Sequence, residues 1–339
     1  MKRFNENKII KNILESSKLN SQPKYPPNLN LIKGIGDDAA YWKDDTYAYC
    51  TSTDSLVDNV HFKLDYFKPS EIGKKSIAVN LSDIAAMGAT PLGLLVNLGI
   101  TKNQDEEWID SFYKGVFEVA EIYNSPIIGG DLVYSSNLFI SITCFGYRDL
   151  KINGNKEVFM DRSKLQEGDL LFVTGYLGDS KAGLEILNSN KSPDLENAHK
   201  KELIKNHIYK SPMVDIGLQL LDNGVKNCID ISDGLLVDTK RLAIASKVDI
   251  NINEDSLPIS DSLKSVFPDN CKKYGLIGGE DYELLFSAPE SIKNKLMNIC
   301  SDLNLNLSVI GEIRKGAGEV FVDGKLSEIK GWDHFDFEL

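Results

Sequence analysis

The stretch SIAVNLSDIAAMGATPLGLLVNL, residues 76–98, contains the pattern that decides the fold class. In its first part apolar residues recur every three or four positions, which predicts a helix over residues 70–87. Gly88 ends this helix, and residues 92–98 follow as an apolar strand. Because helix-like and strand-like segments alternate in both halves of the chain, we expect a mixed α/β fold.

A single aspartate, Asp83, interrupts this apolar helix, and similar acids recur along the chain. They stand beside glycine, serine or threonine in GIGDDAA (Asp37, Asp38), TSTDSL (Ser52, Thr53, Asp54), NLSDIAAM (Asp83), IIGGDLV (Asp131), CIDISDG (Asp230, Ser232, Asp233) and GLIGGEDY (Glu280, Asp281). Each stretch follows or joins an apolar segment, so we expect the acids to meet at the mouth of a sheet, where α/β proteins bind ligands. Carboxylates and hydroxyls supply the oxygen ligands that Mg²⁺ takes. The recurrence therefore predicts a metal site, with the doubled aspartate at one corner.

Each motif taken alone also has a structural interpretation. GIGDD is typical of a solvated turn, and Ser232-Asp233 of a helix N-cap. His61 suits a core histidine, and Trp332 a packing tryptophan. The related stretches NLSDIAAMGA and DISDGLLVDT fit either a duplicated architecture or two N-caps.

Composition narrows the class of protein. The chain has 339 residues, 42% hydrophobic and 26% charged, which suffices for two domains with cores. A net charge of −12 argues against a nucleic-acid partner, and a phosphate substrate would need divalent cations in so acidic a site. We find no apolar run of membrane-spanning length and no signal-type segment, so we expect a cytoplasmic protein without a membrane partner. The five cysteines form no CxxC pair, which favours core packing over zinc or disulfides.

Several local predictions follow from the same patterns. We expect a helix at residues 8–19, a buried strand in SPIIGGD that runs into a glycine turn, a polar loop in SNKSPDLENAHKK, and a hairpin in EVFVDGK. The polar stretch 148–167 indicates the domain boundary. We place one α/β domain at 1–148 and a second at 149–339.

The motifs taken in order resemble one known family. GIGDDAA, STDSLVDNVHF, AVNLSDIAAMGATP, IIGGD, CIDISDGLLVD, GGEDYELLF and GWDHF are similar to the motifs of the thiamine-monophosphate kinases, from about Gly34 to Phe335. That family belongs to the superfamily of aminoimidazole ribonucleotide synthetase. The resemblance implies the two-domain fold of that superfamily, with an N-terminal sheet that pairs across a homodimer. It also implies that ATP and several Mg²⁺ ions serve to phosphorylate thiamine monophosphate to thiamine diphosphate, the last step in making that cofactor.

The resemblance also assigns roles to residues that match the family's motifs. It implies metal ligands at Asp38, Ser52, Thr53, Asp54, Asp83, Asp131, Asp230 and Asp233. It implies ATP contacts at Tyr113, Gly130, Asp131, Arg162 and Ser232, and thiamine phosphate contacts at His61, Glu280 and Trp332. A guanidinium suits a phosphate fork, and an indole can stack on a cationic ring. Glu280 could hydrogen-bond the aminopyrimidine or balance the positive ring. The N-terminal domain would then hold the metals, the ATP and the dimer contact, and the C-terminal domain would complete the phosphate site.

The mechanism expected from these residues is direct transfer of the γ-phosphoryl group. The acceptor is a phosphate monoester that is already largely ionised near neutral pH, so no general base and no protein nucleophile is required.

Three other classes of protein stay open on the residues alone. A selenophosphate synthetase would carry a reactive cysteine near its N-terminus, whereas the first cysteine here is Cys50, and aminoimidazole ribonucleotide synthetase itself lacks the GGEDYEL and GWDHF pair. A two-metal phosphatase would use the same acids without a nucleotide. A calcium-binding structural protein would need the D-x-D-x-D-G order, which DISDG lacks.

Overall fold

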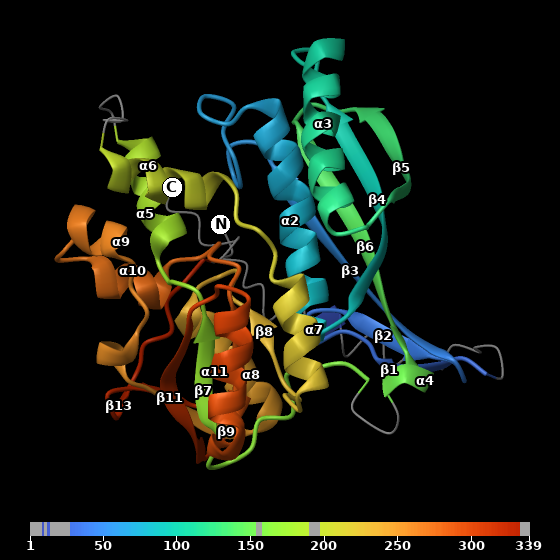
Figure 1. Ribbon diagram of the computed structural model, residues 1–339. Helices are drawn as coiled ribbons and strands as arrows, with labels where there is room; N and C mark the ends of the chain where they lie inside the picture. The colour runs from blue at the N-terminus through green and yellow to red at the C-terminus, as the bar shows by residue number, and fades with distance from the viewer. Residues whose placement is uncertain (1–8, 10–11, 14–27, 154–157, 190–196, 333–339) are drawn as a thin grey trace.

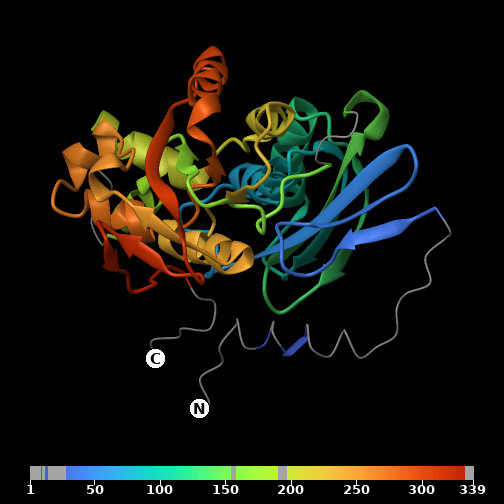
Figure 2. The same cartoon turned by 90° about the horizontal axis from the view of Figure 1, so that it is seen from below.

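The computed structural model describes residues 9, 12–13, 28–153, 158–189 and 197–332, and the helix expected at 8–19 lies almost wholly outside them. The chain forms two mixed sheets with helices packed between them and around them (Figures 1 and 2). The prediction of a mixed α/β fold is confirmed.

The first sheet has six strands in the order β1-β2-β3-β6-β4-β5. They are β1 Asn30–Lys33, β2 Ala40–Lys43, β3 Tyr47–Val57, β4 Thr90–Ile100, β5 Ile127–Tyr134 and β6 Phe139–Asp149. Neighbours run antiparallel, except that β4 and β5 are parallel and are joined through helix α3 (Glu106–Ile122).

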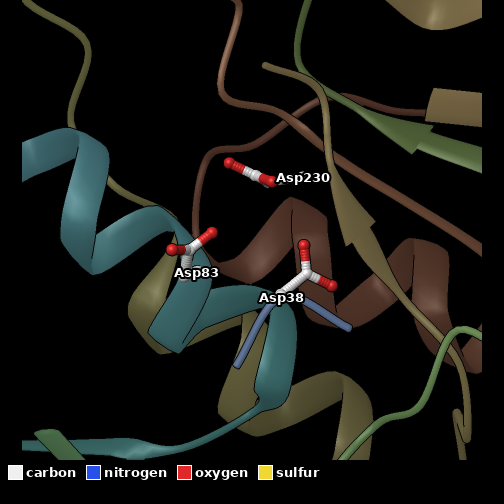
Figure 3. A group of neighbouring side chains, drawn as sticks. All are labelled: Asp38, Asp83 and Asp230. Atoms are coloured by element: carbon white, nitrogen blue, oxygen red, sulfur yellow. The ribbon is translucent and has the colours of Figure 1, made fainter. Parts of the chain in front are cut away.

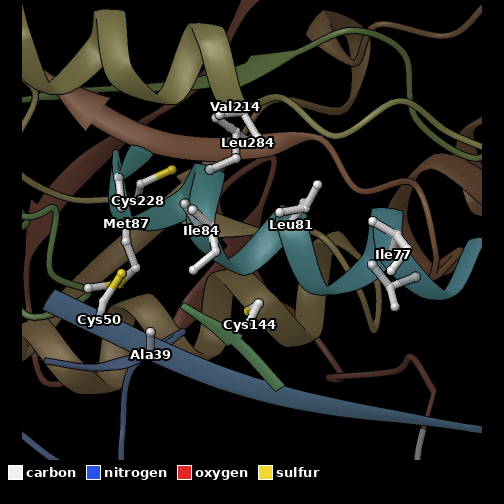
Figure 4. Close-up of a cluster of buried hydrophobic side chains, with 14 of the residues drawn as sticks. Ala39, Cys50, Ile77, Leu81, Ile84, Met87, Cys144, Val214, Cys228 and Leu284 are labelled. Carbon is white, nitrogen blue, oxygen red and sulfur yellow. The ribbon is translucent and has the colours of Figure 1, made fainter. Parts of the chain in front are cut away.

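Helix α2 (Pro69–Met87) is the central element of the molecule and the helix predicted in that stretch. It begins with proline at its first turn and ends at Gly88, whose left-handed φ of 67° suits a residue without Cβ. Its side chains are buried on almost every side rather than along one stripe. Figure 4 shows the reason: Ala39, just before β2, and Cys144 of β6 lie on one side of α2, and Val214 and Leu284 of the second half lie on the other.

The glycine turn predicted after SPIIGG is wrong. Residues 129–131 lie inside β5, which is an exposed edge strand parallel to β4. Gly130 is needed there because a Cβ would come 1.9 Å from the Val96 carbonyl oxygen. Two consecutive glycines can therefore indicate a close contact between strands as well as a turn.

The second sheet has seven strands in the order β13-β12-β9-β11-β7-β10-β8. They are β7 Leu170–Thr174, β8 Ile229–Asp230, β9 Val248–Ile252, β10 Leu284–Ala288, β11 Leu307–Lys315, β12 Val320–Val322 and β13 Lys325–Leu326. The helices of this half are α5 Asp179–Asn188, α6 Ala198–Ile208, α7 Val214–Asp222, α8 Leu235–Ser246 and α11 Lys293–Asp302, with shorter α9 Asp261–Val266 and α10 Cys271–Ile277. The short helix α4 Leu150–Asn153 directly follows β6 of the first sheet.

Two local predictions in this half have different outcomes. The hairpin is confirmed, since β12 and β13 pair across Asp323 and Gly324, which have φ of 50° and 75°. The polar loop predicted in SNKSPDLENAHKK is wrong at its end, because α6 begins at Ala198 after Asn197 caps it. In the part of the chain that the structure describes, no helix is long and apolar enough to cross a bilayer.

Candidate active site

A cavity of about 650 Å³ lies where α2 meets both sheets. Its walls come from the turn before β2, from β3 and α2 on one side, and from α5, the β8–α8 loop, the residues before β10 and the chain after β13 on the other. Seven acidic and three basic side chains line it. The site is therefore strongly negative, and it draws on residues from both halves of the chain.

Three aspartates form the centre of the acidic end (Figure 3). Asp38 comes from the turn before β2, Asp83 from α2 and Asp230 from β8, and one carboxylate oxygen of each lies within 4.8 Å of the others. Residues almost 200 positions apart thus converge because α2 lies between the two sheets. Hard oxygen ligands at this spacing fit a divalent cation such as Mg²⁺.

Two of these carboxylates have hydroxyl groups as their hydrogen-bond donors. Ser52 Oγ donates to Asp83 Oδ2 at 2.5 Å, and Ser82 Oγ donates to Asp230 Oδ2 at 2.6 Å. Burial raises the pKa of both acids well above the usual range; Asp54 adds most to the effect on Asp83, and Asp38 to that on Asp230. Like charges this close disfavour ionisation unless a cation compensates them.

Arg162 supplies positive charge at the third carboxylate. Its Nε lies 3.0 Å from Asp38 Oδ2 and its Nη2 lies 2.5 Å from Asp38 Oδ1, a two-point contact. The neighbouring Asp37 has its pKa raised to about 7 by burial and by Asp38, although Arg162 and Lys33 oppose the rise. The doubled aspartate of the sequence is therefore part of a charged network, not a solvated turn.

A second arginine holds the loop between β8 and α8. Asp238 Oδ2 accepts hydrogen bonds from the backbone N–H groups of Ser232, Asp233 and Gly234. Arg241 then bridges Asp238 and Asp233 at 2.6 and 2.5 Å. The N-cap of α8 is Gly234, so the predicted capping role of Ser232-Asp233 is wrong, and both residues face the cavity instead.

The similar stretch NLSDIAAMGA does not start a helix either. Ser82 and Asp83 lie well inside α2, whereas Ser232 and Asp233 precede α8. Neither Ser-Asp pair is an N-cap, so what the two stretches share is their position on the cavity wall.

The lining of the same cavity includes the residues predicted to contact thiamine phosphate. These are His61, Glu280 and Trp332, and the apolar or aromatic residues Val60, Leu184, Ile277 and Tyr282 line the cavity with them. The backbone N–H of Val57 donates to His61 Nδ1 at 3.0 Å, so the imidazole proton lies on Nε2. The backbone N–H of Trp332 donates to the Asp233 carbonyl at 2.9 Å, and the residue is 48% exposed, so Trp332 is not a core residue.

The cavity brings together most of the residues predicted from sequence. Those that line it are Asp38, Ser52, Asp54, Asp83, Asp230, Asp233, Arg162, Ser232, His61, Glu280 and Trp332. Thr53 points to the opposite face of β3, where its Oγ1 donates to the Ile142 carbonyl. Tyr113 on α3, and Gly130 and Asp131 on β5, also lie outside the cavity of the single chain, and their roles stay predictions.

Some residues around the site are not among the site residues predicted from the sequence. Tyr282, which lies in the GGEDYELLF motif but was given no role, lines the cavity with a φ of 49°. Ser82 orients Asp230, while Lys75 and His207 contact Glu280 from beneath the cavity. A buried lysine in an apolar helix could have been noticed, because such a charge requires a partner.

The comparisons with known proteins agree with this geometry. Residues 36–147 match the N-terminal domain of AIR synthase related proteins, and residues 166–324 match their C-terminal domain. The chain is 36% identical to the thiamine-monophosphate kinase of Aquifex aeolicus over 310 residues, which are 89% of this chain and 93% of that one. It is 35% identical to the enzyme of Bacillus subtilis over 311 residues, again 89% and 93%. The chain belongs to the thiamine-monophosphate kinase family.

A solved structure supports the same membership. The structure described as AaThiL complexed with AMPPCP and TMP matches with a TM-score of 0.84 and 33% identity, over 98% of both chains. This chain therefore shares the two-domain architecture of the thiamine-monophosphate kinase family.

Proposed function

We propose that this protein transfers the γ-phosphoryl group of ATP to thiamine monophosphate and so forms thiamine diphosphate, the last step in making that cofactor. The observation that carries the proposal is the lining of one cavity. A cluster of acids at Asp38, Asp83 and Asp230 shares that cavity with Glu280 and Trp332. This matches an acceptor with a phosphate at one end and a cationic heteroaromatic system at the other.

The acidic end fits Mg²⁺. Its donors are carboxylate and hydroxyl oxygens, and its excess of negative charge would repel two phosphate-bearing substrates. The family motifs imply eight metal ligands, and the six that line the cavity are the ones we expect to hold several ions: Asp38, Ser52, Asp54, Asp83, Asp230 and Asp233. Thr53 and Asp131, the other two, lie outside the cavity of the single chain. Bound Mg²⁺ would neutralise the phosphates and support the charge of the transition state.

The remaining residues bind and orient. Arg162 and Ser232 stand beside the acids, where we place the ATP phosphates. His61 presents Nε2–H as a donor, and Glu280 and Trp332 receive the organic part of thiamine phosphate. We infer direct in-line transfer without a phosphoenzyme, because the ionised acceptor needs no base and positioning supplies most of the catalysis.

We further propose a homodimer in which the N-terminal sheets pair. The edge strand β5 exposes Ile128 at 59%, Leu132 at 53% and Tyr134 at 76%. An apolar exposed edge invites a second strand or sheet. Pairing there would place Gly130 and Asp131 in an interface, which is why they can serve a site although they lie outside their own chain's cavity.

We also propose the domain division and the cellular compartment that we expected from the sequence. The division into domains 1–148 and 149–339 fits the two sheets, with the cavity between them. The cytoplasm is the compartment we propose, because the reaction consumes ATP.

The first test measures ADP and thiamine diphosphate released by the purified protein with ATP and Mg²⁺. Thiamine phosphate, thiamine and no acceptor are compared. The proposal expects ADP only with thiamine phosphate, in equal amount to thiamine diphosphate. ADP without an acceptor product, or phosphate released from thiamine phosphate, would favour a hydrolase. No ATP turnover at all would favour a cation-binding structural protein.

A further inference from the structure

Glu280 has an unusual backbone conformation, and contacts with neighbouring residues are needed to hold its side chain in the cavity. Its φ is 64°, in the left-handed region that a non-glycine residue adopts only when the surroundings hold it there. Its backbone N–H donates to the Ser232 carbonyl at 2.8 Å, which ties this residue to the loop of the acidic end. Its side chain is 24% exposed and lines the cavity.

The support comes from a lysine beneath the cavity. Lys75 on α2 places Nζ 3.1 Å from Glu280 Oε1 and 3.2 Å from the His207 carbonyl oxygen, and 5.5 Å from the centre of the Phe67 ring. Its side chain is only 3% exposed. A buried ammonium is costly unless it is paired, so the pair with Glu280 is a requirement of the fold as well as of the site.

The second contact of Glu280 carries no charge. His207 Nδ1 lies 3.4 Å from Glu280 Oε2 and 3.1 Å from Ser180 Oγ. Burial, and then Lys75, lower the pKa of His207 to about 3, so this imidazole is neutral. The positive charge that balances Glu280 is therefore that of Lys75.

This pairing changes what Glu280 can recognise. A carboxylate that already has an ammonium at 3.1 Å presents little net negative charge to the cavity. It keeps lone pairs on its exposed side, because each carboxylate oxygen accepts about two hydrogen bonds. Such a group suits a neutral N–H donor better than a cation.

We propose that Lys75 is a positioning residue for the acceptor: it fixes Glu280 as an oriented hydrogen-bond acceptor for the neutral amino group of the aminopyrimidine, and not as a counter-ion for the thiazolium. The proposal rests on the proposed function. The cationic ring is then left to the exposed indole face of Trp332.

The test measures dissociation constants by titration calorimetry in the presence of Mg²⁺, with ATP absent when the acceptor is titrated. The ligands are thiamine phosphate, its analogue with an oxo group in place of the amino group, and separately Mg-ATP. We expect the wild-type protein to bind the oxo analogue at least about tenfold more weakly, since a donor is replaced by an acceptor facing a carboxylate. Equal affinity for both would overturn the assignment of Glu280 to the amino group.

A double-mutant cycle of Lys75 and Glu280 separates a positioning role of Lys75 from a general effect on stability. Lys75→Met is expected to weaken thiamine phosphate binding about tenfold or more, with Mg-ATP affinity unchanged within about twofold. Glu280→Gln is expected to weaken it as well. The double variant should bind like Glu280→Gln alone, because Lys75 acts only through Glu280. Additive losses in the double variant would overturn the proposal.

Lys74→Met is the matched control. Lys74 is the neighbouring lysine on the same helix, but it pairs with Glu118 on α3 at 2.6 Å, away from the cavity. Lys74→Met should leave the affinities for thiamine phosphate, its oxo analogue and Mg-ATP unchanged. If Lys75→Met alone does not fold, the double variant, which removes both charges, and the oxo analogue still decide the matter.

The outcomes also separate this inference from the proposed function. Failure of the wild-type protein to bind or phosphorylate thiamine phosphate would remove both. Normal binding and turnover by the wild-type protein, with unchanged affinity in Lys75→Met, would remove only the role of Lys75.

Discussion

Arg162 donates two hydrogen bonds to the Asp38 carboxylate, from Nε at 3.0 Å and from Nη2 at 2.5 Å. The family motifs, in contrast, assign the arginine to ATP and the aspartate to a metal. The guanidinium thus supplies the positive charge that the Asp38 carboxylate requires. The Arg162 side chain is 17% exposed at the cavity wall. The arrangement keeps one carboxylate of the acidic end compensated. It also places an arginine fork beside the position that we propose for the phosphates.

Replacing Arg162 by lysine should therefore damage two interactions. Lysine keeps the charge but loses the planar fork that matches a carboxylate or a phosphate. We expect Arg162→Lys to lower kcat/KM for ATP by about tenfold to a hundredfold, and Arg162→Gln to lower it further. Steady-state kinetics with varied ATP measure this. Arg314→Lys, on an exposed arginine that pairs with Glu312, is the control and should match the wild-type protein.

Asp83→Asn should separate activity from stability. Asparagine keeps an oxygen that can accept the Ser52 hydroxyl, but it has no charge with which to bind a cation, and it needs no proton to be neutral beside Asp54, Asp230 and Asp38. We expect kcat to fall roughly a thousandfold, because a metal ligand is lost. In metal-free buffer we expect the melting temperature to rise, by about 2–4 °C for each kcal/mol that protonation of the buried Asp83 costs the wild-type protein.

Calorimetric melting and steady-state assays check both halves of this prediction. Asp110→Asn, at an exposed position of α3, should change neither quantity. A variant that retains activity, or that melts lower than the wild-type protein in metal-free buffer, would contradict a metal role for Asp83.

The sequence was informative where local chemistry controls the structure. Gly88 marked the end of α2, and the Asp323-Gly324 turn marked the hairpin, because both need positive φ. Motif order identified the acids that meet in the cavity, but their spacing could not show that α2 would bring Asp83 next to Asp230. That contact depends on the packing of two sheets on one helix.

Other features could not be found because their cause is distant in the sequence. The paired glycines before Asp131 resemble a turn, but Gly130 allows a close approach to Val96 on the neighbouring strand β4. Lys75 and His207 have no motif, and their partner Glu280 comes from a loop 73 or more positions away along the chain. Only the assembled tertiary structure reveals that the three residues act together.

The proposed dimer can be tested at the exposed edge strand. Leu132→Lys places a charge among the apolar side chains of β5, where Leu132 is 53% exposed. We expect sedimentation or light scattering to show a dimer for the wild-type protein and a monomer for the variant, because a buried unpaired charge opposes association. The control is Ile244→Lys on α8, 58% exposed and outside the first sheet. An unchanged dimer in Leu132→Lys would exclude pairing through β5.

His207 predicts how stability depends on pH. Its pKa is lowered from 6.5 to about 3 in the folded chain, so the unfolded state binds the proton more tightly. The contribution of the neutral His207 to the free energy of unfolding is complete above pH 6.5 and is lost as the pH falls below that value. Between pH 7.5 and pH 5 the wild-type protein should lose about 2 kcal/mol more than His207→Gln. Glu280 acts only at a lower pH, since the pKa of a glutamate is ordinarily 4.5 and the pairing with Lys75 lowers it further.

Urea unfolding at the two pH values measures this difference directly. His199→Gln, at an exposed position of the same helix α6, should keep the pH dependence of the wild-type protein. Equal pH dependence in His207→Gln and the wild-type protein would mean that the imidazole becomes charged in the folded state. His207 would then share with Lys75 the task of balancing Glu280, so this measurement also tests the charge assignment beneath the cavity.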